Sequence, residues 1–308
     1  MHRGFHGAAR VVSAATSAAA ILLGSSRAAA QQHTELAVSG GLATDQAGTR
    51  SRALVFAPLL AWNEGLGAWV VLGATLARYE HGALAVGGHA DLERRDLIAE
   101  PLSFTLDASA SLSRLDAKGR AAAFASGDAL PALEIAIGPL AFLGGLRLAA
   151  GHLAQSGSRP IVPSVTSGSR MAAGPVFGMS FGTDVAPSGY VEVGFREGTM
   201  RIEGSTLVDR VLSLRVAGPA ARVRGDIGRR VSGVGAGERF GAAAVDVTVL
   251  RGIEFIASAG WYLADPLVRT RGGSYVNAGF ALQADGGGFP RAHDPRDRRR
   301  GNDLRRRG

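Results

Sequence analysis

The sequence of 308 residues contains no cysteine and a single lysine, Lys118. Without cysteine the chain has no disulfide scaffold, no thiolate zinc site and no cysteine nucleophile, and any lysine chemistry has one candidate. Charged residues make up only 19% of the chain and the mean hydropathy is +0.12, which is too apolar for a disordered protein. These absences leave a folded chain whose few charges must be located before they are interpreted.

Long apolar runs are also missing from the body of the chain. The longest uncharged runs, Ile135–Leu146 and Gly65–Ala77, are interrupted by glycines and are shorter than the roughly 20 residues that a membrane-spanning helix needs. This excludes a helical inner-membrane protein.

The N-terminus has the three parts of an export signal. Arg3 and Arg10 provide a positive segment, Val11–Gly24 is uncharged and rich in alanine, and Ala28–Ala30 supplies small residues before Gln31. We predict that residues 1–30 are a signal peptide cleaved near Ala30.

The net charge of +8 is concentrated at the two ends. Residues 1–30 contribute +3 and residues 285–308 contribute +4, so the body between them carries only +1. The tail 285–308 is rich in Arg, Asp, Gly and Pro, and we predict a disordered basic extension that is solvated or contacts an anionic envelope polymer. We expect no nucleic-acid partner, because export removes the opportunity and the tail lacks stacking aromatics.

Apolar and polar residues alternate with period two along the whole body, most clearly at 102–113, where Leu, Phe and Ala alternate with Ser, Thr and Asp. Such segments predict strands long enough to cross a bilayer at a tilt, for which roughly 9 to 11 residues are needed. The predicted strands are Thr34–Thr44, Ala53–Trp62, Ala68–Tyr79, Ala83–Leu92, Pro101–Arg114, Arg120–Gly138, Phe142–Ala154, Arg170–Thr183, Gly189–Glu197, Leu207–Ala217, Ala221–Val231, Arg239–Leu250, Ile253–Ala264 and Ser274–Ala284.

Connections between these segments alternate in length, as the short periplasmic turns and longer outer loops of a membrane barrel do. Two connections break the rule, because the third, 80–82, is short and the fourth, 93–100, is long. The sixth segment is long enough to be one bulged strand or two strands. We therefore predict an all-β fold, a transmembrane up-and-down antiparallel β-barrel of about 14 strands (12 to 16), over residues 31–284.

All tyrosines and tryptophans fall near predicted strand ends. Aromatic girdles at the two membrane interfaces would place them there, although aromatic residues also favour strands in general. The predicted girdle consists of Trp62, Trp69, Tyr79, Tyr190, Trp261, Tyr262 and Tyr275.

The pattern resembles that of bacterial outer-membrane β-barrel proteins in general, over about Thr34 to Ala284. The last strand, with Asn277, Gly279, Phe280 and Leu282, is similar to part of the family's C-terminal targeting strand, but here the chain continues for 24 residues. The resemblance implies a Gram-negative envelope protein in the outer membrane, surrounded by outer-membrane lipid, with both termini in the periplasm.

The predicted hairpin over 207–231 separates apolar from charged side chains. Charge is costly on the lipid side at bilayer depth, so the charged face must point into the lumen. An arginine-lined passage would favour anions; alternatively, nearby carboxylates neutralise the arginines in a salt-bridged network that braces the wall, which is the interpretation we favour. The predicted lumen-lining residues are Asp209, Arg215, Arg222, Arg224, Asp226 and Arg230.

Catalytic signals are weak. Gly178–Gly182 matches G-x-S-x-G around Ser180, but it lies within a predicted strand and its only downstream histidine is in the tail. His89 and His152 are candidates for a lipid hydrolase, yet no spacing identifies a serine partner. No metal-ligand cluster or cofactor signature occurs. We therefore expect no enzymatic activity, no cofactor and no metal.

The leading hypothesis is an outer-membrane barrel that acts as a small-solute channel or a structural wall protein. One alternative is an exported soluble or surface-attached β protein, such as a sandwich or solenoid, with a binding role. Pro58 and Pro175 within proposed strands favour it, because each removes a ladder hydrogen bond. A second alternative is an outer-membrane lipid-modifying enzyme.

Overall fold

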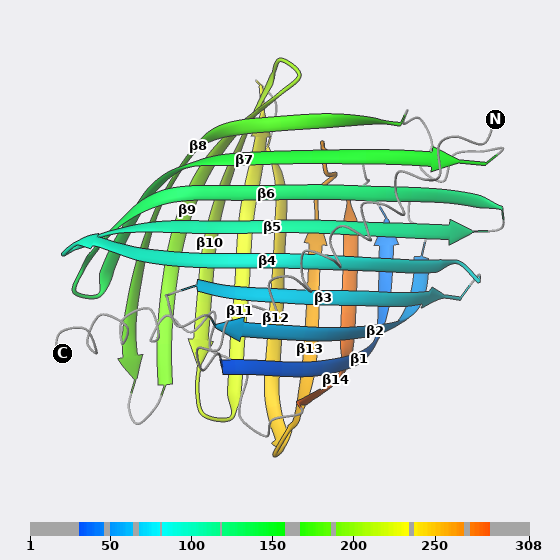
Figure 1. The fold of residues 1–308 in the computed structure, drawn as a ribbon, viewed down its shortest axis with the longest axis horizontal. Helices are drawn as coiled ribbons and strands as arrows, with labels where there is room; N and C mark the ends of the chain where they lie inside the picture. Colours follow the sequence, from blue (N-terminus) through cyan, green and yellow to red (C-terminus); the bar gives the residue numbers. More distant parts are fainter. Residues whose placement is uncertain are drawn as a thin grey trace, which may run out of the picture.

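The alternating segments form fourteen strands, which the computed structural model joins into one closed barrel. Every strand pairs antiparallel with its neighbours in sequence, and β1 (Gln31–Asp45) pairs with β14 (Gly273–Gln283) to close the sheet. In Figure 1, the strands β2 to β8 run across the view in front of β9 to β14, which cross behind them at a steep angle. Strands tilted around a barrel axis give this crossing.

The structure describes residues 31–45, 50–63, 68–80, 82–117, 119–157, 167–185, 189–233, 237–267 and 272–283. The predicted signal peptide and basic tail lie outside these ranges. Within them, no helix is long and apolar enough to cross a membrane. The strands between β1 and β14 are β2 (Arg50–Asn63), β3 (Ala68–Tyr79), β4 (Leu84–Ala99), β5 (Leu102–Ala117), β6 (Arg120–Ile137), β7 (Leu140–Ser156), β8 (Gly168–Val185), β9 (Gly189–Ile202), β10 (Ser205–Ala217), β11 (Ala221–Ser232), β12 (Glu238–Leu250) and β13 (Ile253–Tyr262).

The predicted barrel and strand count are confirmed, and the closed sheet excludes the sandwich and solenoid alternatives. The ambiguous sixth segment is one continuous strand, β6. Two predicted loops are wrong, because the flanking strands continue through them: β4 extends to Ala99, and β9 and β10 meet at a turn of only Glu203 and Gly204. Both turn residues have positive φ, as tight hairpin turns require.

These corrections make the two barrel ends more distinct. We call the end that carries the connections after even-numbered strands the short-turn end, since each connection there has at most four residues. The opposite end, which we call the long-loop end, carries the two longest connections, 157–167 and 263–272.

Prolines within the strands each interrupt pairing on one side only. Pro58 pairs with Leu36 of β1 but has no partner in β3, and Pro175 pairs with Leu146 of β7 but has no partner in β9. Proline lacks the N–H needed for one ladder bond, so the other ladder keeps the strand in place. These residues therefore fit a barrel.

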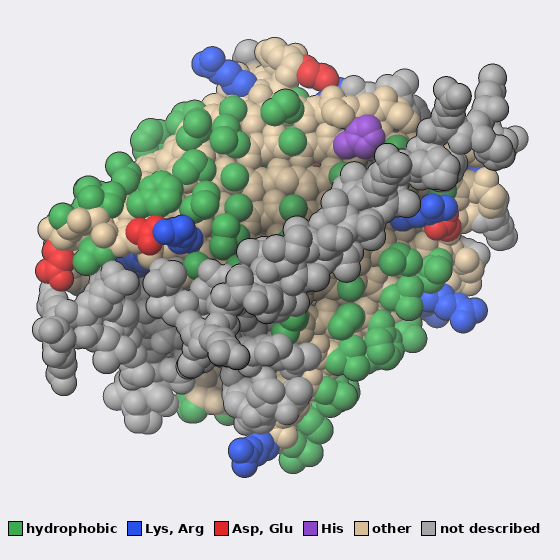
Figure 2. Space-filling view, viewed as in Figure 1, with side chains coloured by type: hydrophobic (Ala, Val, Ile, Leu, Met, Phe, Trp, Pro, Cys, Tyr) green, Lys and Arg blue, Asp and Glu red, His purple; other side chains and the backbone are tan. Residues whose placement is uncertain are grey.

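Burial alternates with the same period as polarity. Leu212 and Val276 are 51% and 59% exposed, and their register partners across the sheet are exposed apolar residues too. Figure 2 shows apolar side chains spread over the outer face of the barrel. The concave face instead buries polar groups, including Ser103, Glu134 and Glu254. We call these two faces outward and interior.

Candidate functional site: the charged barrel interior

The six predicted lumen residues occupy the interior face of one hairpin, β10–β11. In its register Asp209 pairs with Arg230 and Arg215 pairs with Arg224, between rows in which Leu212 pairs with Ile227 and Val216 pairs with Val223. Because side chains alternate faces along a strand, the apolar rows point outward and the charged rows point into the barrel.

Two of the hairpin's interior arginines are ion-paired. The Arg230 guanidinium donates two hydrogen bonds to Asp209, with its Nε and Nη2 at 2.7 and 2.8 Å from the carboxylate oxygens. This contact joins β10 to β11 and defines the pair as a brace between the two strands.

 Arg222 is paired as well, since its Nη2 lies 2.7 Å from the Glu254 carboxylate and its Nε lies 3.7 Å from Asp246.

Ion pairs between strands also occur on the interior face of β4 to β7. Arg95 of β4 donates to Glu134 of β6 at 2.7 Å, and Arg147 of β7 donates to Asp128 of β6 at 2.5 Å. Each pair joins different strands across the interior face. The predicted salt-bridged network is therefore present at these four arginines.

Arg215 and Arg224 differ from all of them. They are directly opposite each other in the β10–β11 register, and neither has a carboxylate within 4.0 Å among the described residues. The other register partner of Arg215 is Glu192, whose carboxylate accepts a hydrogen bond of 2.8 Å from the Tyr190 hydroxyl. Asp226, the next interior position after Arg224, also makes no ion pair in the described part of the chain.

Arg196 of β9 adds to this wall a third guanidinium that makes no ion pair with a described residue. It pairs in register with Val211, which has the interior parity of Asp209 and Arg215. The sequence reasoning missed Arg196, although the outward alternation of Val191, Val193 and Phe195 carries the signal. We call Arg196, Arg215 and Arg224 the free arginine cluster.

Carboxylates gather on the opposite stretch of wall. Glu93 of β4 is the direct register partner of Asp107 of β5, and Asp91 pairs with Ser109 one interior position away. The interior is thus charged in two regions of opposite sign, an acidic one on β4 and β5 and a basic one on β9 to β11.

A segment of the connection between β13 and β14 enters the mouth at the long-loop end. Arg170 of β8 donates to the Pro266 carbonyl at 2.8 Å, and Arg230 donates to the Ala264 carbonyl at 3.3 Å. Leu267 packs against a buried interior cluster that includes Met200 and Ile202. These contacts narrow the mouth, and no period-two pattern could have predicted them.

Most residues of the predicted aromatic girdle do not have the outward parity of the lipid-facing positions, and the girdle stays a prediction. Trp261 faces outward and is 47% exposed, as a girdle residue should be. Tyr190 is only 2% exposed and lies over Gly182, which has no side chain to obstruct the ring. The register also gives interior parity to Trp69, Tyr79, Tyr262 and Tyr275. The side chain of Trp62 lies outside the described part of the structure.

The reason is that a position near a strand end does not decide a side chain's face. Tyr262 and Tyr275 contact each other at the rim, with ring centroids 6.4 Å apart. The tyrosine rings therefore lie mainly in the interior and at its edge, whereas phenylalanine rings such as those of Phe177 and Phe280 are exposed on the outward face.

The candidate catalytic residues do not meet. Ser180 lies in regular strand β8 on the interior face, paired with Ala141 and Gly194, so the strand–turn–helix of a nucleophile elbow is missing there. His89 is interior and lies over Gly73. His152 is outward, and its Nδ1 lies 2.8 Å from the Ser169 hydroxyl of β8. In the described ranges, no three His, Asp or Glu side chains are grouped to hold a metal ion.

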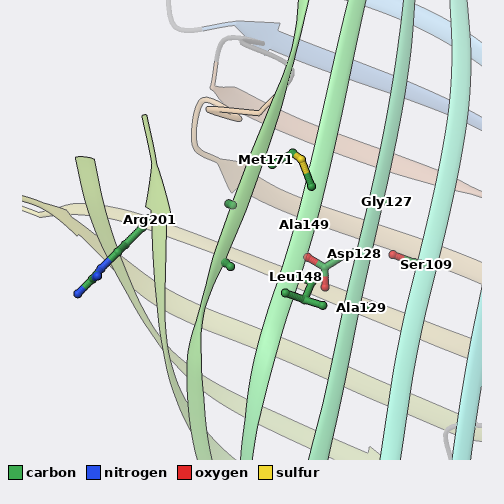
Figure 3. Close-up of a pocket in the computed structure, with 10 residues that line it drawn as sticks. Ser109, Gly127, Asp128, Ala129, Leu148, Ala149, Met171 and Arg201 are labelled. Atoms are coloured by element: carbon green, nitrogen blue, oxygen red, sulfur yellow. The ribbon is translucent and has the colours of Figure 1, made fainter. Parts of the chain in front are cut away.

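Next to the contact between His152 and Ser169, toward the middle of the barrel, a small depression of about 620 Å³ is lined by residues of β5 to β9. Figure 3 shows Leu148 and Met171 on neighbouring strands within it, and Arg201 extending from its edge. Met171 follows Ser169 by one outward position.

Comparisons with known proteins show what the fold resembles. No protein-family model matches the sequence, and no curated protein matches it either. The structure resembles bacterial outer-membrane β-barrels. OmpT of Vibrio cholerae is 8% identical, with 82% of this chain and 97% of that chain covered and a TM-score of 0.41.

Two further solved structures are from Acinetobacter baumannii. The outer membrane protein Omp33 is 8% identical, with 82% of this chain and 97% of that chain covered and a TM-score of 0.42. CdiB is 8% identical with a TM-score of 0.49; the match covers 81% of this chain but only 60% of CdiB. The class of fold, a closed antiparallel barrel, is defined by the strand pairing of this chain itself.

Proposed function

We propose that the protein is an outer-membrane channel for small solutes, in which the free arginine cluster forms an anion-binding site. The observation that carries the proposal is the direct pairing of Arg215 with Arg224 across two strands. Like charges directly opposite in a sheet destabilise it, so this arrangement is best explained by an anion that approaches both guanidinium groups. Arginine offers a planar fork of donors that suits carboxylate and phosphate groups.

The location follows from the outward face. An exposed apolar surface around a closed barrel needs a lipid environment, and strands of 10 to 18 residues exceed the roughly 9 to 11 needed to cross a bilayer. Export by residues 1–30 would place the short-turn end in the periplasm, with outer-membrane lipid as the surrounding partner.

The acidic region on β4 and β5 bears on selectivity. Carboxylates there and guanidinium groups on β9 to β11 would attract opposite ends of a solute that carries both charges. We therefore expect a modest anion preference rather than exclusion of cations.

Planar bilayers with a KCl gradient test the proposal directly. The purified, refolded chain should conduct, and replacing both Arg215 and Arg224 with Gln should lower the chloride-to-potassium permeability ratio about fivefold, since two charges act on one ion at close range. Arg78→Gln is the matched control, because Arg78 is an outward arginine of β3 that makes no ion pair with a described residue, and its loss should leave the ratio unchanged.

A bilayer that stays silent with folded, inserted protein would instead identify a structural wall protein. Folding is checked independently by the heat-modifiable shift of the barrel on a gel. An open channel whose ion preference is the same with and without the two arginines would refute the anion site.

A second candidate function, lipid hydrolysis, rests on the contact between His152 and Ser169. A histidine within hydrogen-bond distance of a serine hydroxyl can act as its general base, and the apolar depression below could hold an acyl chain. We nevertheless expect no enzymatic activity, because no described carboxylate orients His152. Ester hydrolysis in phospholipid micelles that disappears in Ser169→Ala but persists in Ser180→Ala would overturn that expectation.

A further inference from the structure

The outward face carries its charges almost entirely at the long-loop end. Eight outward arginines lie in the halves of the strands nearest that end, whereas at the short-turn end the outward charges of the described strands are Arg94 and Asp96, which pair at 2.8 Å. The eight are Arg50, Arg52, Arg78, Arg114, Arg201, Arg210, Arg229 and Arg239.

Three of these arginines form one continuous row across the sheet. Arg210 of β10 is the register partner of Arg229 of β11, and Arg229 is the partner of Arg239 of β12. Glu197 of β9 ends the row and bonds only Arg210, at 2.7 Å. Among the described residues, no carboxylate pairs with Arg229 or Arg239, and both side chains are exposed.

Apolar residues adjoin this row on the side toward the middle of the barrel. Leu212, Ile227 and Gly241 form the next outward row, and Gly241 pairs with Trp261. This surface borders a shallow depression of about 1210 Å³, lined mostly by outward side chains that include Leu212, Ile227 and Trp261.

We infer that Arg229 and Arg239, next to Trp261, bind the anionic phosphorylated headgroup of a membrane lipid whose acyl chains lie over the apolar rows. Charge complementarity supports this occupant: two opposed guanidinium groups repel each other until a phosphate lies between them, and each can donate two hydrogen bonds to it. A tryptophan one outward row nearer the middle of the barrel suits the boundary between headgroups and chains. Because the arginines occupy one end only, the lipid belongs to the leaflet at the long-loop end.

The proposal does not depend on the channel. The site lies on the outer face of β11 to β13, whereas the free arginine cluster lies inside the barrel. A barrel with no conductance could bind the lipid, and a conducting barrel could lack it.

Trp261 provides a local probe. We would convert Trp62 and Trp69 to Phe, refold the chain into phosphatidylcholine vesicles and confirm folding by the heat-modifiable gel shift. Trp261 fluorescence is then quenched with phosphatidic acid that carries bromine on its acyl chain, at low mole fraction, and separately with equally brominated phosphatidylcholine.

Binding at the proposed site predicts quenching by the phosphatidic acid equivalent to a local enrichment of about fivefold, and no enrichment of the phosphatidylcholine. Arg229→Gln with Arg239→Gln should abolish the enrichment, whereas Arg78→Gln, which removes a charge from the same end but a distant strand, should retain it. Equal quenching by both lipids would overturn the proposal, as would enrichment that survives the double substitution. The proposal would also be overturned if Arg78→Gln removed the enrichment to the same extent. The lipid would then be attracted by the total positive charge at the long-loop end and not by a local site.

Discussion

Arg230 and Arg224 lie on the same strand, face the same interior and are three positions apart in their row of interior side chains, yet their surroundings are opposite. Arg230 faces Asp209 and makes two hydrogen bonds to it, whereas Arg224 faces another arginine. The difference teaches that residue type and face do not decide an arginine's role in a barrel. The cross-strand partner decides whether it braces the wall or remains available to a solute.

The largest effect is expected where a brace is broken. The side chains of Arg230 and Asp209 are 19% and 13% exposed, so removing the arginine leaves a mostly buried carboxylate without its partner. Arg230→Ala should lower the free energy of unfolding by about 3 kcal/mol, measured by urea unfolding from lipid vesicles. Adding Asp209→Ala should recover part of the loss, and additive losses would show that the two side chains do not interact.

A smaller effect is expected where a brace is weakened but not removed. Glu254→Gln removes the closer partner of Arg222 but leaves Asp246 at 3.7 Å. We expect a loss of about 2 kcal/mol in unfolding free energy, because a hydrogen bond to a charged group is removed. The channel should also become more anion-selective, because one negative charge beside the Arg222 guanidinium is removed. Unchanged ion preference in a stably folded variant would show that Arg222 does not face the solute pathway.

The smallest effect on stability is expected at the free cluster. Arg224→Gln removes the repulsion with Arg215 and should raise the unfolding free energy by about 0.5 kcal/mol, with Leu214→Ala on the outward face as a comparison for packing changes. A loss as large as that of Arg230→Ala would mean that Arg224 is a brace after all.

Much of the fold could be predicted from period-two alternation, because a barrel places every second side chain in a different solvent. Alternation located the strands and the face of Arg215, Arg222 and Arg224. It could not separate paired from free arginines, since pairing depends on register between strands and on long-range neighbours such as Glu254.

Two other features could not be predicted from the sequence for the same reason. The entry of Ala264–Leu267 into the mouth depends on contacts with β8 and β11, which are distant in sequence. The interior position of Tyr190 depends on Gly182 of the neighbouring strand, which leaves room for the ring. In both cases the local sequence is compatible with the opposite placement.

Because the chain contains no cysteine, a cysteine introduced by substitution is the one thiol that can be modified. Arg224→Cys introduces a single thiol, which can be modified in an open channel by a methanethiosulfonate that carries either an ammonium or a sulfonate group. Leu214→Cys, on the outward face of the neighbouring strand, is the matched control. The account predicts that the cysteine variant loses anion preference, that the ammonium reagent restores it and that the sulfonate reagent shifts selectivity toward cations, with no such change at Leu214→Cys. Ion selectivity that is indifferent to the charge attached at position 224 would contradict the central claim.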